Sequence, residues 1–178
     1  MIKKTYYLLF FILLFSCRKE DLYECNPTPF SPTPFTIASP PGFPTMIIPE
    51  DNQTTLEGVA LGEKIFNDVI LSRNQTISCA SCHIQNNSFS DPNQYSFGVD
   101  GLTGNRNASA IINLGWSSNF NWDGSASSLE EQAFEPITNH LEMDNTWENV
   151  ENRLNTHSEY PRLFKNCLLY TSPSPRDS

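Results

Sequence analysis

The segment Cys79-Ala80-Ser81-Cys82-His83 constrains this 178-residue chain more than any other feature of its sequence. Two cysteines three positions apart, followed directly by a histidine, form the C-x-x-C-H attachment signature of c-type haem. On one helical turn both thiols can reach the vinyl groups of a porphyrin, while the imidazole binds the iron. We therefore expect Cys79 and Cys82 to be thioether anchors of a covalent haem and His83 to be its proximal ligand.

Other chemistries also use a C-x-x-C pair. A thioredoxin-like redox pair expects a strand–helix–strand context, which the surrounding sequence lacks. A zinc site needs two more ligands, and only Cys25, His140 and His157 remain, at unsuitable spacings. A structural disulfide is the third alternative. The histidine that follows the pair, together with the export signal described next, favours haem.

The N-terminus has the pattern of a bacterial export signal. Lys3 and Lys4 precede an apolar run of about ten residues, whereas a membrane span needs about 20. The residues Leu14 to Cys17 resemble a lipobox, so we expect residues 1–16 to be removed and Cys17 to carry lipid. An ordinary signal peptide, with Cys17 as a bystander, is the alternative. The expected location is the periplasm or cell surface, with a lipid anchor in the membrane.

A proline-rich segment follows the signal. Residues 26–50 hold eight of the 13 prolines, a density that blocks helix and favours extended geometry. We expect residues 17–44 to be a tether, with the part from Phe43 to Pro49 packing back on the domain. Cys25 lies in this tether without an evident partner.

Residues 45–166 have the pattern of a single all-α domain with long loops. Helices are expected over residues 56–66, capped by Thr54 or Thr55, and over residues 127–134, capped by Ser127. Two more are expected over residues 146–156 and from about residue 158. Residues 84–125 are rich in Asn, Ser, Gly and Asp, and loops of that length are consistent with a large cofactor. The net charge of −9 argues against a nucleic-acid partner.

Several short segments together resemble the bacterial di-haem cytochrome c peroxidases and the related MauG family, over residues 45–166. In chain order they are Leu61 to Asp68, Leu71 to Asn74, Ile77 to His83, Phe89 to Asp91, Gly104 to Ala108, Trp122 to Gly124, Ser128 to Ala133, Asn139 to Met143 and Glu159 to Phe164. The resemblance implies a cytochrome c-like fold, specifically the N-terminal, peroxidatic haem domain. It implies reduction of hydrogen peroxide with electrons from a small cytochrome or cupredoxin, or MauG-like oxidation of another substrate.

The resemblance also implies roles for individual residues. Glu142 matches the distal carboxylate that moves a proton during peroxide cleavage, and Gln132 matches the distal amide that orients peroxide or water. Trp122 matches the aromatic residue between the two haems, and Asn107 matches a calcium ligand at the domain boundary. By residue type alone, Trp122 would be assigned to the core, and Glu142 and Gln132 to the solvated surface.

The sequence departs from the family pattern at three points. The loop from Phe97 to Gly101 lacks the distal histidine of members that need reductive activation, and Ser125 replaces an arginine. Only one C-x-x-C-H occurs, so the second haem is expected in a longer, intact protein. Residues 167–178 look like a translated sequencing adapter, a non-native tail, although a native polar tail is the alternative.

A different class of function remains open. Small electron-transfer cytochromes close the sixth iron position with methionine, and Met143 lies 60 residues beyond His83. The alternative to the peroxidase is therefore a mono-haem carrier with Met143 as axial ligand.

Overall fold

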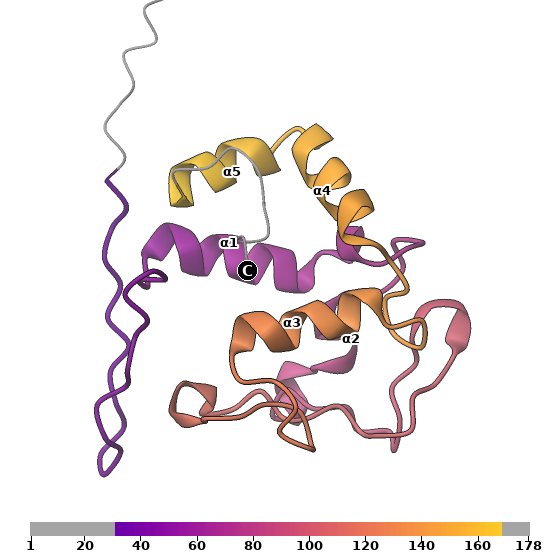
Figure 1. Ribbon diagram of the computed structural model, residues 1–178, viewed down its shortest axis with the longest axis horizontal. Helices are drawn as coiled ribbons and strands as arrows, with labels where there is room; N and C mark the ends of the chain where they lie inside the picture. Colours follow the sequence, from indigo (N-terminus) through magenta and orange to yellow (C-terminus); the bar gives the residue numbers. More distant parts are fainter. Residues whose placement is uncertain (1–30, 169–178) are drawn as a thin grey trace, which may run out of the picture.

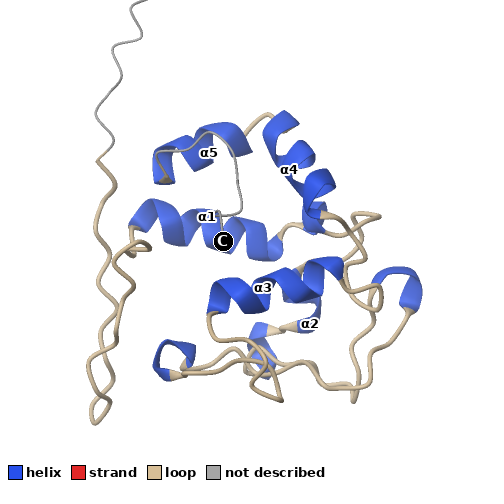
Figure 2. Ribbon diagram, in the orientation of Figure 1, coloured by secondary structure: helices blue, strands red, loops and turns tan. Residues whose placement is uncertain are grey.

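The computed structural model describes residues 31–168 and contains helices and loops but no strand in that range. The signal peptide, Cys17, Cys25 and residues 169–178 of the expected tail lie outside the described residues. The α-helices are α1 (Leu56–Asn67), α2 (Cys79–Cys82), α3 (Leu129–Thr138), α4 (Trp147–Thr156) and α5 (Tyr160–Cys167). Short 3₁₀ turns lie at η1 (Val69–Leu71), η2 (Gln85–Asn87), η3 (Val99–Gly101) and η4 (Leu114–Trp116). The expected all-α class is confirmed (Figure 2).

Helix α1 begins where the sequence indicated, but α3 begins one residue later. Thr55 caps α1, its hydroxyl accepting from the Gly58 amide at 3.0 Å. The prediction of Ser127 as the cap of α3 was wrong, because Ser128 accepts from the Glu131 amide at 3.0 Å. The Glu131 carboxylate in turn accepts from the Ser127 amide and hydroxyl, each at 2.7 Å. Ser127 is thus bonded by the first turn of α3 without being its cap.

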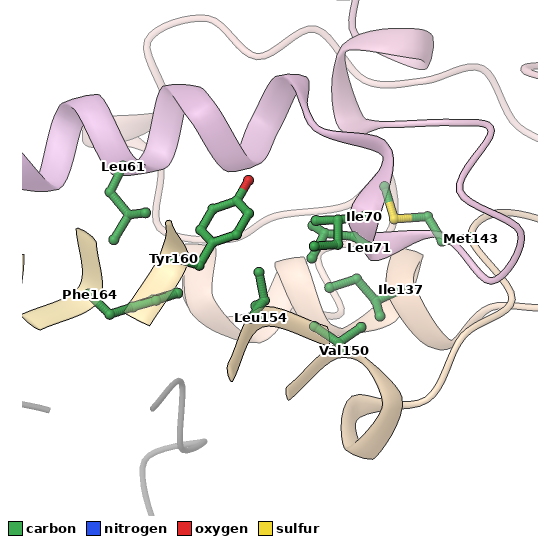
Figure 3. Close-up of a cluster of buried hydrophobic side chains, with 9 residues drawn as sticks. All are labelled: Leu61, Ile70, Leu71, Ile137, Met143, Val150, Leu154, Tyr160 and Phe164. Carbon is green, nitrogen blue, oxygen red and sulfur yellow. The ribbon is translucent and has the colours of Figure 1, made fainter. Parts of the chain in front are cut away.

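The hydrophobic core lies between α1, α3, α4, α5 and η1. In Figure 1, α1 runs between α5 on one side and α2 and α3 on the other. Tyr160 is fully buried, and its hydroxyl donates to the Asp68 carboxylate at 2.6 Å, which ties α5 to the end of α1. The core side chains labelled in Figure 3 are Leu61, Ile70, Leu71, Ile137, Met143, Val150, Leu154, Tyr160 and Phe164.

The proline-rich segment runs alongside the domain in extended passes (Figure 1). The Phe43 and Trp116 rings meet edge to face with centroids 4.9 Å apart, and the Trp116 indole donates to the Pro44 carbonyl at 2.8 Å. Earlier in the segment, the Thr33 hydroxyl donates to the Glu57 carboxylate at 2.9 Å. The segment therefore packs on the domain both at Phe43–Pro44 and at Thr33, which lies within the expected tether.

Candidate haem site

The two cysteines of the C-x-x-C-H segment lie on the one-turn helix α2, next to the core. The Ser78 amide donates to the Ser81 hydroxyl at 3.0 Å, which fixes the start of the turn. Cys79 and Cys82 are half-buried free thiols, and Cys79 packs against the core cluster. Burial raises the pKa of both thiols. The structure therefore keeps both sulfurs unpaired with each other, as thioether formation with a porphyrin requires.

The imidazole of His83 is held in one orientation by the loop that follows α2. Its Nδ1 lies 3.0 Å from the Phe89 carbonyl oxygen, and a carbonyl can only accept, so Nδ1 carries the proton. The same oxygen accepts from the Ile111 amide at 3.3 Å. Both Ser88 and Phe89 have positive φ, at 56° and 55°. This left-handed pair turns the Phe89 carbonyl toward the ring and leaves the Nε2 lone pair free to bind a metal.

These residues fit a covalent haem. The pair of free thiols on one turn and the unprotonated Nε2 on the next residue are the groups that c-type haem needs. No group of three His, Cys, Asp or Glu side chains that could hold a metal occurs among residues 31–168.

Glu142 lies in the segment after α3 with its carboxyl group half-buried. The Asn139 amide donates to its Oε1 at 2.8 Å, and the Asn139 oxygen accepts from the Leu141 amide at 3.0 Å. Burial raises the pKa of Glu142. The charge of Glu142 in turn contributes to the raised pKa of Cys82, after burial and the charge of Asp91. Glu142 is therefore within electrostatic reach of a haem-attachment cysteine, although 60 residues separate the two in sequence.

A glycine brings the 97–102 loop directly onto the backbone that carries Glu142. A Cβ added at Gly98 would lie 2.0 Å from the Leu141 carbonyl oxygen and 2.7 Å from that of Glu142. The next residue, Val99, is 1% exposed, and its amide donates to the Glu142 carbonyl at 2.8 Å. No side chain other than hydrogen fits at residue 98 without moving this backbone.

Gln132 and Trp122 differ in exposure. Gln132 is half-buried on α3. Trp122 is 65% exposed, so it is not a core residue, and its indole donates to the Asn107 carbonyl at 2.7 Å. Residue type alone would have assigned Trp122 to the core, whereas the structure leaves most of this side chain accessible.

The side chain of Asn107 holds loops together. Its amide nitrogen donates to the Asn93 carbonyl at 2.7 Å and to the Asp91 carbonyl at 3.1 Å. Its amide oxygen lies 3.1 Å from the Ser90 hydroxyl. These contacts connect the segment after His83 to the loop that leads to Trp122, across 14 to 17 residues of sequence.

Two neighbours of the site were missed at the sequence level. Asn139 was named only as part of a motif, and its hydrogen bond to the Glu142 carboxyl group depends on the turn after α3. Asp91 is 7% exposed and accepts from the Asn93 amide at 2.8 Å. Burial alone would raise the pKa of Asp91, but the hydrogen bonds that its carboxylate accepts from Asn93 lower the pKa. No local sequence pattern distinguishes these residues from other polar loop residues.

An all-α domain with two free thiols on one helical turn, followed by an imidazole whose Nε2 is available to a metal, is typical of c-type cytochromes. The sequence profile of the family described as di-haem cytochrome c peroxidase matches residues 56–174. The chain therefore belongs to the di-haem cytochrome c peroxidase family, whose members include the MauG proteins.

Named relatives support this assignment. The methylamine utilization protein MauG of Methylorubrum extorquens is 40% identical over 120 residues, which are 67% of this chain and 34% of that protein. The cytochrome c peroxidase Ccp of Escherichia coli is 37% identical over 122 residues, 68% of this chain and 26% of the relative. A MauG-like protein associated with microbial copper homeostasis superposes with a TM-score of 0.68 at 31% identity, covering 75% of this chain and 40% of the other. The chain thus spans about a third of the length of the curated relatives it matches.

Proposed function

We propose that the intact protein reduces hydrogen peroxide to two waters, with two electrons from a small cytochrome or cupredoxin and two protons. Peroxide would react at the haem held by Cys79, Cys82 and His83. When bound, the haem supplies the iron that takes up peroxide and passes electrons to it. The observation that carries the proposal is the half-buried Glu142 carboxyl, with its raised pKa, beside the haem-attachment turn. Family membership and relatives named as peroxidases agree with it.

In this proposal Glu142 moves the proton that cleavage requires. It takes the proton from the inner peroxide oxygen and returns it to the outer oxygen, which leaves as water. A carboxyl with a raised pKa exchanges a proton more readily near neutral pH than an exposed one. The Asn139 amide would hold the carboxyl in place, and Gln132 would orient peroxide or water from α3.

Trp122 would relay electrons between the haem of this domain and a second haem in the intact protein. Its exposed ring supports a role at a surface that another domain covers, and its bond to Asn107 links it to the loop after His83. Asn107 is the proposed calcium ligand at the same boundary. Its amide oxygen, near the Ser90 hydroxyl, is the atom that would bind the ion.

Replacement of the carboxyl tests the proposed reaction. In the intact, haem-loaded protein and with an artificial electron donor, Glu142→Gln should lower the rate of peroxide reduction by about 100-fold or more, with haem content unchanged. Glu148→Gln is the matched control, because Glu148 is an exposed carboxylate in the first turn of α4. Unchanged turnover in Glu142→Gln contradicts the proposed role.

The electron-carrier alternative requires Met143 on the iron. Met143 is 4% exposed and packs in the core beside Ile70, Leu71 and Ile137, which supports a structural role instead (Figure 3). A carrier predicts a methionine–iron charge-transfer band that disappears in Met143→Ala. The peroxidase proposal predicts a haem without this band that binds cyanide readily.

We also propose that the protein is exported and anchored by lipid on Cys17. No helix among the described residues is long and apolar enough to cross a membrane. The basic and apolar start of the sequence and the lipobox-like residues before Cys17 support the proposal. Mass spectrometry of the membrane fraction should find an N-terminal peptide that begins at lipidated Cys17, and an unmodified Cys17 would contradict it.

A further inference from the structure

Arg73 connects three segments that are distant in sequence. Its Nε donates to the Asp144 carboxylate at 2.7 Å, and its other guanidinium nitrogen pairs with Asp100. Its backbone amide donates to the Met143 carbonyl at 2.8 Å. Both carboxylates raise the pKa of Arg73, so the charged form is favoured. One side chain therefore spans contacts 27 and 71 residues away.

Each of the three segments contributes to the proposed reaction site. Residues 70–74 lead directly into the haem-attachment turn, and residues 141–144 carry Glu142. The third segment, η3, contains Asp100 and presses against the Glu142 backbone through Gly98 and Val99. Arg73 thus joins the segment before the haem anchor to the two residues that follow Glu142 and to the loop that packs on the Glu142 backbone.

The backbone of residues 70–73 is held by hydrogen bonds from side chains of other segments. Arg153 on α4 donates to the Ser72 and Arg73 carbonyls, each at 2.7 Å, and to the Ile70 carbonyl at 3.0 Å. The buried Asn145 donates to the Leu71 carbonyl at 2.7 Å. Every carbonyl from Ile70 to Arg73 therefore accepts a side-chain hydrogen bond from α4 or from the residues just before it. These hydrogen bonds fix the backbone that carries the Arg73 guanidinium.

Stability alone does not account for the arrangement. The Arg73 side chain is 46% exposed, and ion pairs this accessible contribute little to the free energy of unfolding. Asp100 and Asp144 both have positive φ, at 61° and 49°, so each partner lies at a turn whose backbone costs energy to hold. What the pairs do define is the distance between the haem-anchor segment and the Glu142 backbone.

We propose that Arg73 is a positioning residue for peroxide reduction. Through Asp144 and Asp100 it holds the 141–144 segment and the η3 loop against each other, and so fixes the Glu142 carboxyl relative to the haem-attachment turn. In this role Arg73 acts through the two carboxylates that it binds. This inference rests on the proposed function, because it concerns the residue assigned there to proton transfer.

The first test measures loop docking without any turnover. Hydrogen exchange of the Val99 amide reports directly on its bond to the Glu142 carbonyl. Arg73→Ala should speed this exchange about tenfold, and Arg73→Lys, which keeps one ion pair, should speed it less. Arg106→Ala is the matched control: an exposed arginine paired with Asp123 at 2.8 Å, which should leave Val99 exchange unchanged. Unchanged exchange in Arg73→Ala overturns the inference.

The second test is a double-mutant cycle on the rate of peroxide reduction. Arg73→Ala should lower that rate about tenfold in the wild-type background and leave it unchanged in the Glu142→Gln background, because both changes disable the same group. Arg73→Lys should restore part of the loss. Equal losses in both backgrounds overturn this inference only. Full turnover in Glu142→Gln alone overturns the proposed function, and this inference with it.

Discussion

Replacing Gly98 with alanine should destabilise the domain strongly, although it adds only a methyl group. The new Cβ would lie 2.0 Å from the Leu141 carbonyl oxygen, far inside van der Waals contact, and backbone oxygen cannot swing aside as a side chain would. The η3 loop must therefore move away from the 141–142 backbone. That movement removes the hydrogen bond from Val99 to Glu142 and opens the pocket that buries Val99.

The magnitude follows from these two effects. Overpacking of a fitted contact costs about 1–3 kcal/mol. The lost hydrogen bond contributes about 1 kcal/mol more. We expect the free energy of unfolding of Gly98→Ala to fall by about 2–4 kcal/mol relative to the wild type.

Urea denaturation of the haem-loaded protein measures this change, as a lower midpoint with an unchanged slope. Gly62→Ala is the matched control, because Gly62 lies within α1 and a Cβ added there meets nothing within 4 Å. The control should gain up to about 1 kcal/mol from helix propensity, so the two substitutions differ in sign. A Gly98→Ala protein within 0.5 kcal/mol of the wild type would refute the close approach of η3 to Glu142.

Three further predictions concern buried polar groups. Tyr160→Phe should lower the free energy of unfolding by about 1.5–3 kcal/mol, because it removes a charge-assisted hydrogen bond to Asp68. A loss below about 0.5 kcal/mol in urea denaturation would count against that bond. Asn145→Ala should cost about 1–3 kcal/mol in the same assay, because the Leu71 carbonyl loses its buried donor, and an unchanged midpoint would contradict this. Burial raises the pKa of Glu142, so the folded state binds the carboxyl proton more tightly than the unfolded state does. The contribution of Glu142 to stability is therefore complete below pH 4.5, the ordinary pKa of a glutamate. It is lost as the pH rises through the raised pKa of the folded state. Glu142→Gln should flatten this part of the pH profile, and identical profiles would show that Glu142 is not the group responsible.

The sequence predicted α1 and α4 well because each carries its own local signals. Thr55 precedes an apolar face with the helical period, and Trp147, Val150 and Leu154 follow one another on one side of α4. The cap of α3 was misplaced because Ser127 and Ser128 are each followed three residues later by a glutamate. Both therefore satisfy the capping-box pattern, and only the structure shows which hydroxyl accepts from the helix.

The candidate site combines local and distant features. The C-x-x-C-H segment is contiguous, so the sequence alone predicts it as a haem anchor, and the resemblance predicts the role of Glu142 from its position. The network around Glu142 was not readable, because Arg73, Asp100 and Asp144 are brought together by turns with positive φ at non-glycine residues. Trp122 shows the limit of residue type: a tryptophan is expected inside, yet this one is largely exposed.

Attachment of haem to the C-x-x-C-H turn is the central claim, and intact-protein mass spectrometry after co-expression with a cytochrome c maturation system tests it most directly. We predict a polypeptide heavier by one covalently bound haem, and complete loss of covalent attachment when Cys79 and Cys82 are both replaced by alanine. A wild-type chain with only the mass of its polypeptide would contradict the claim.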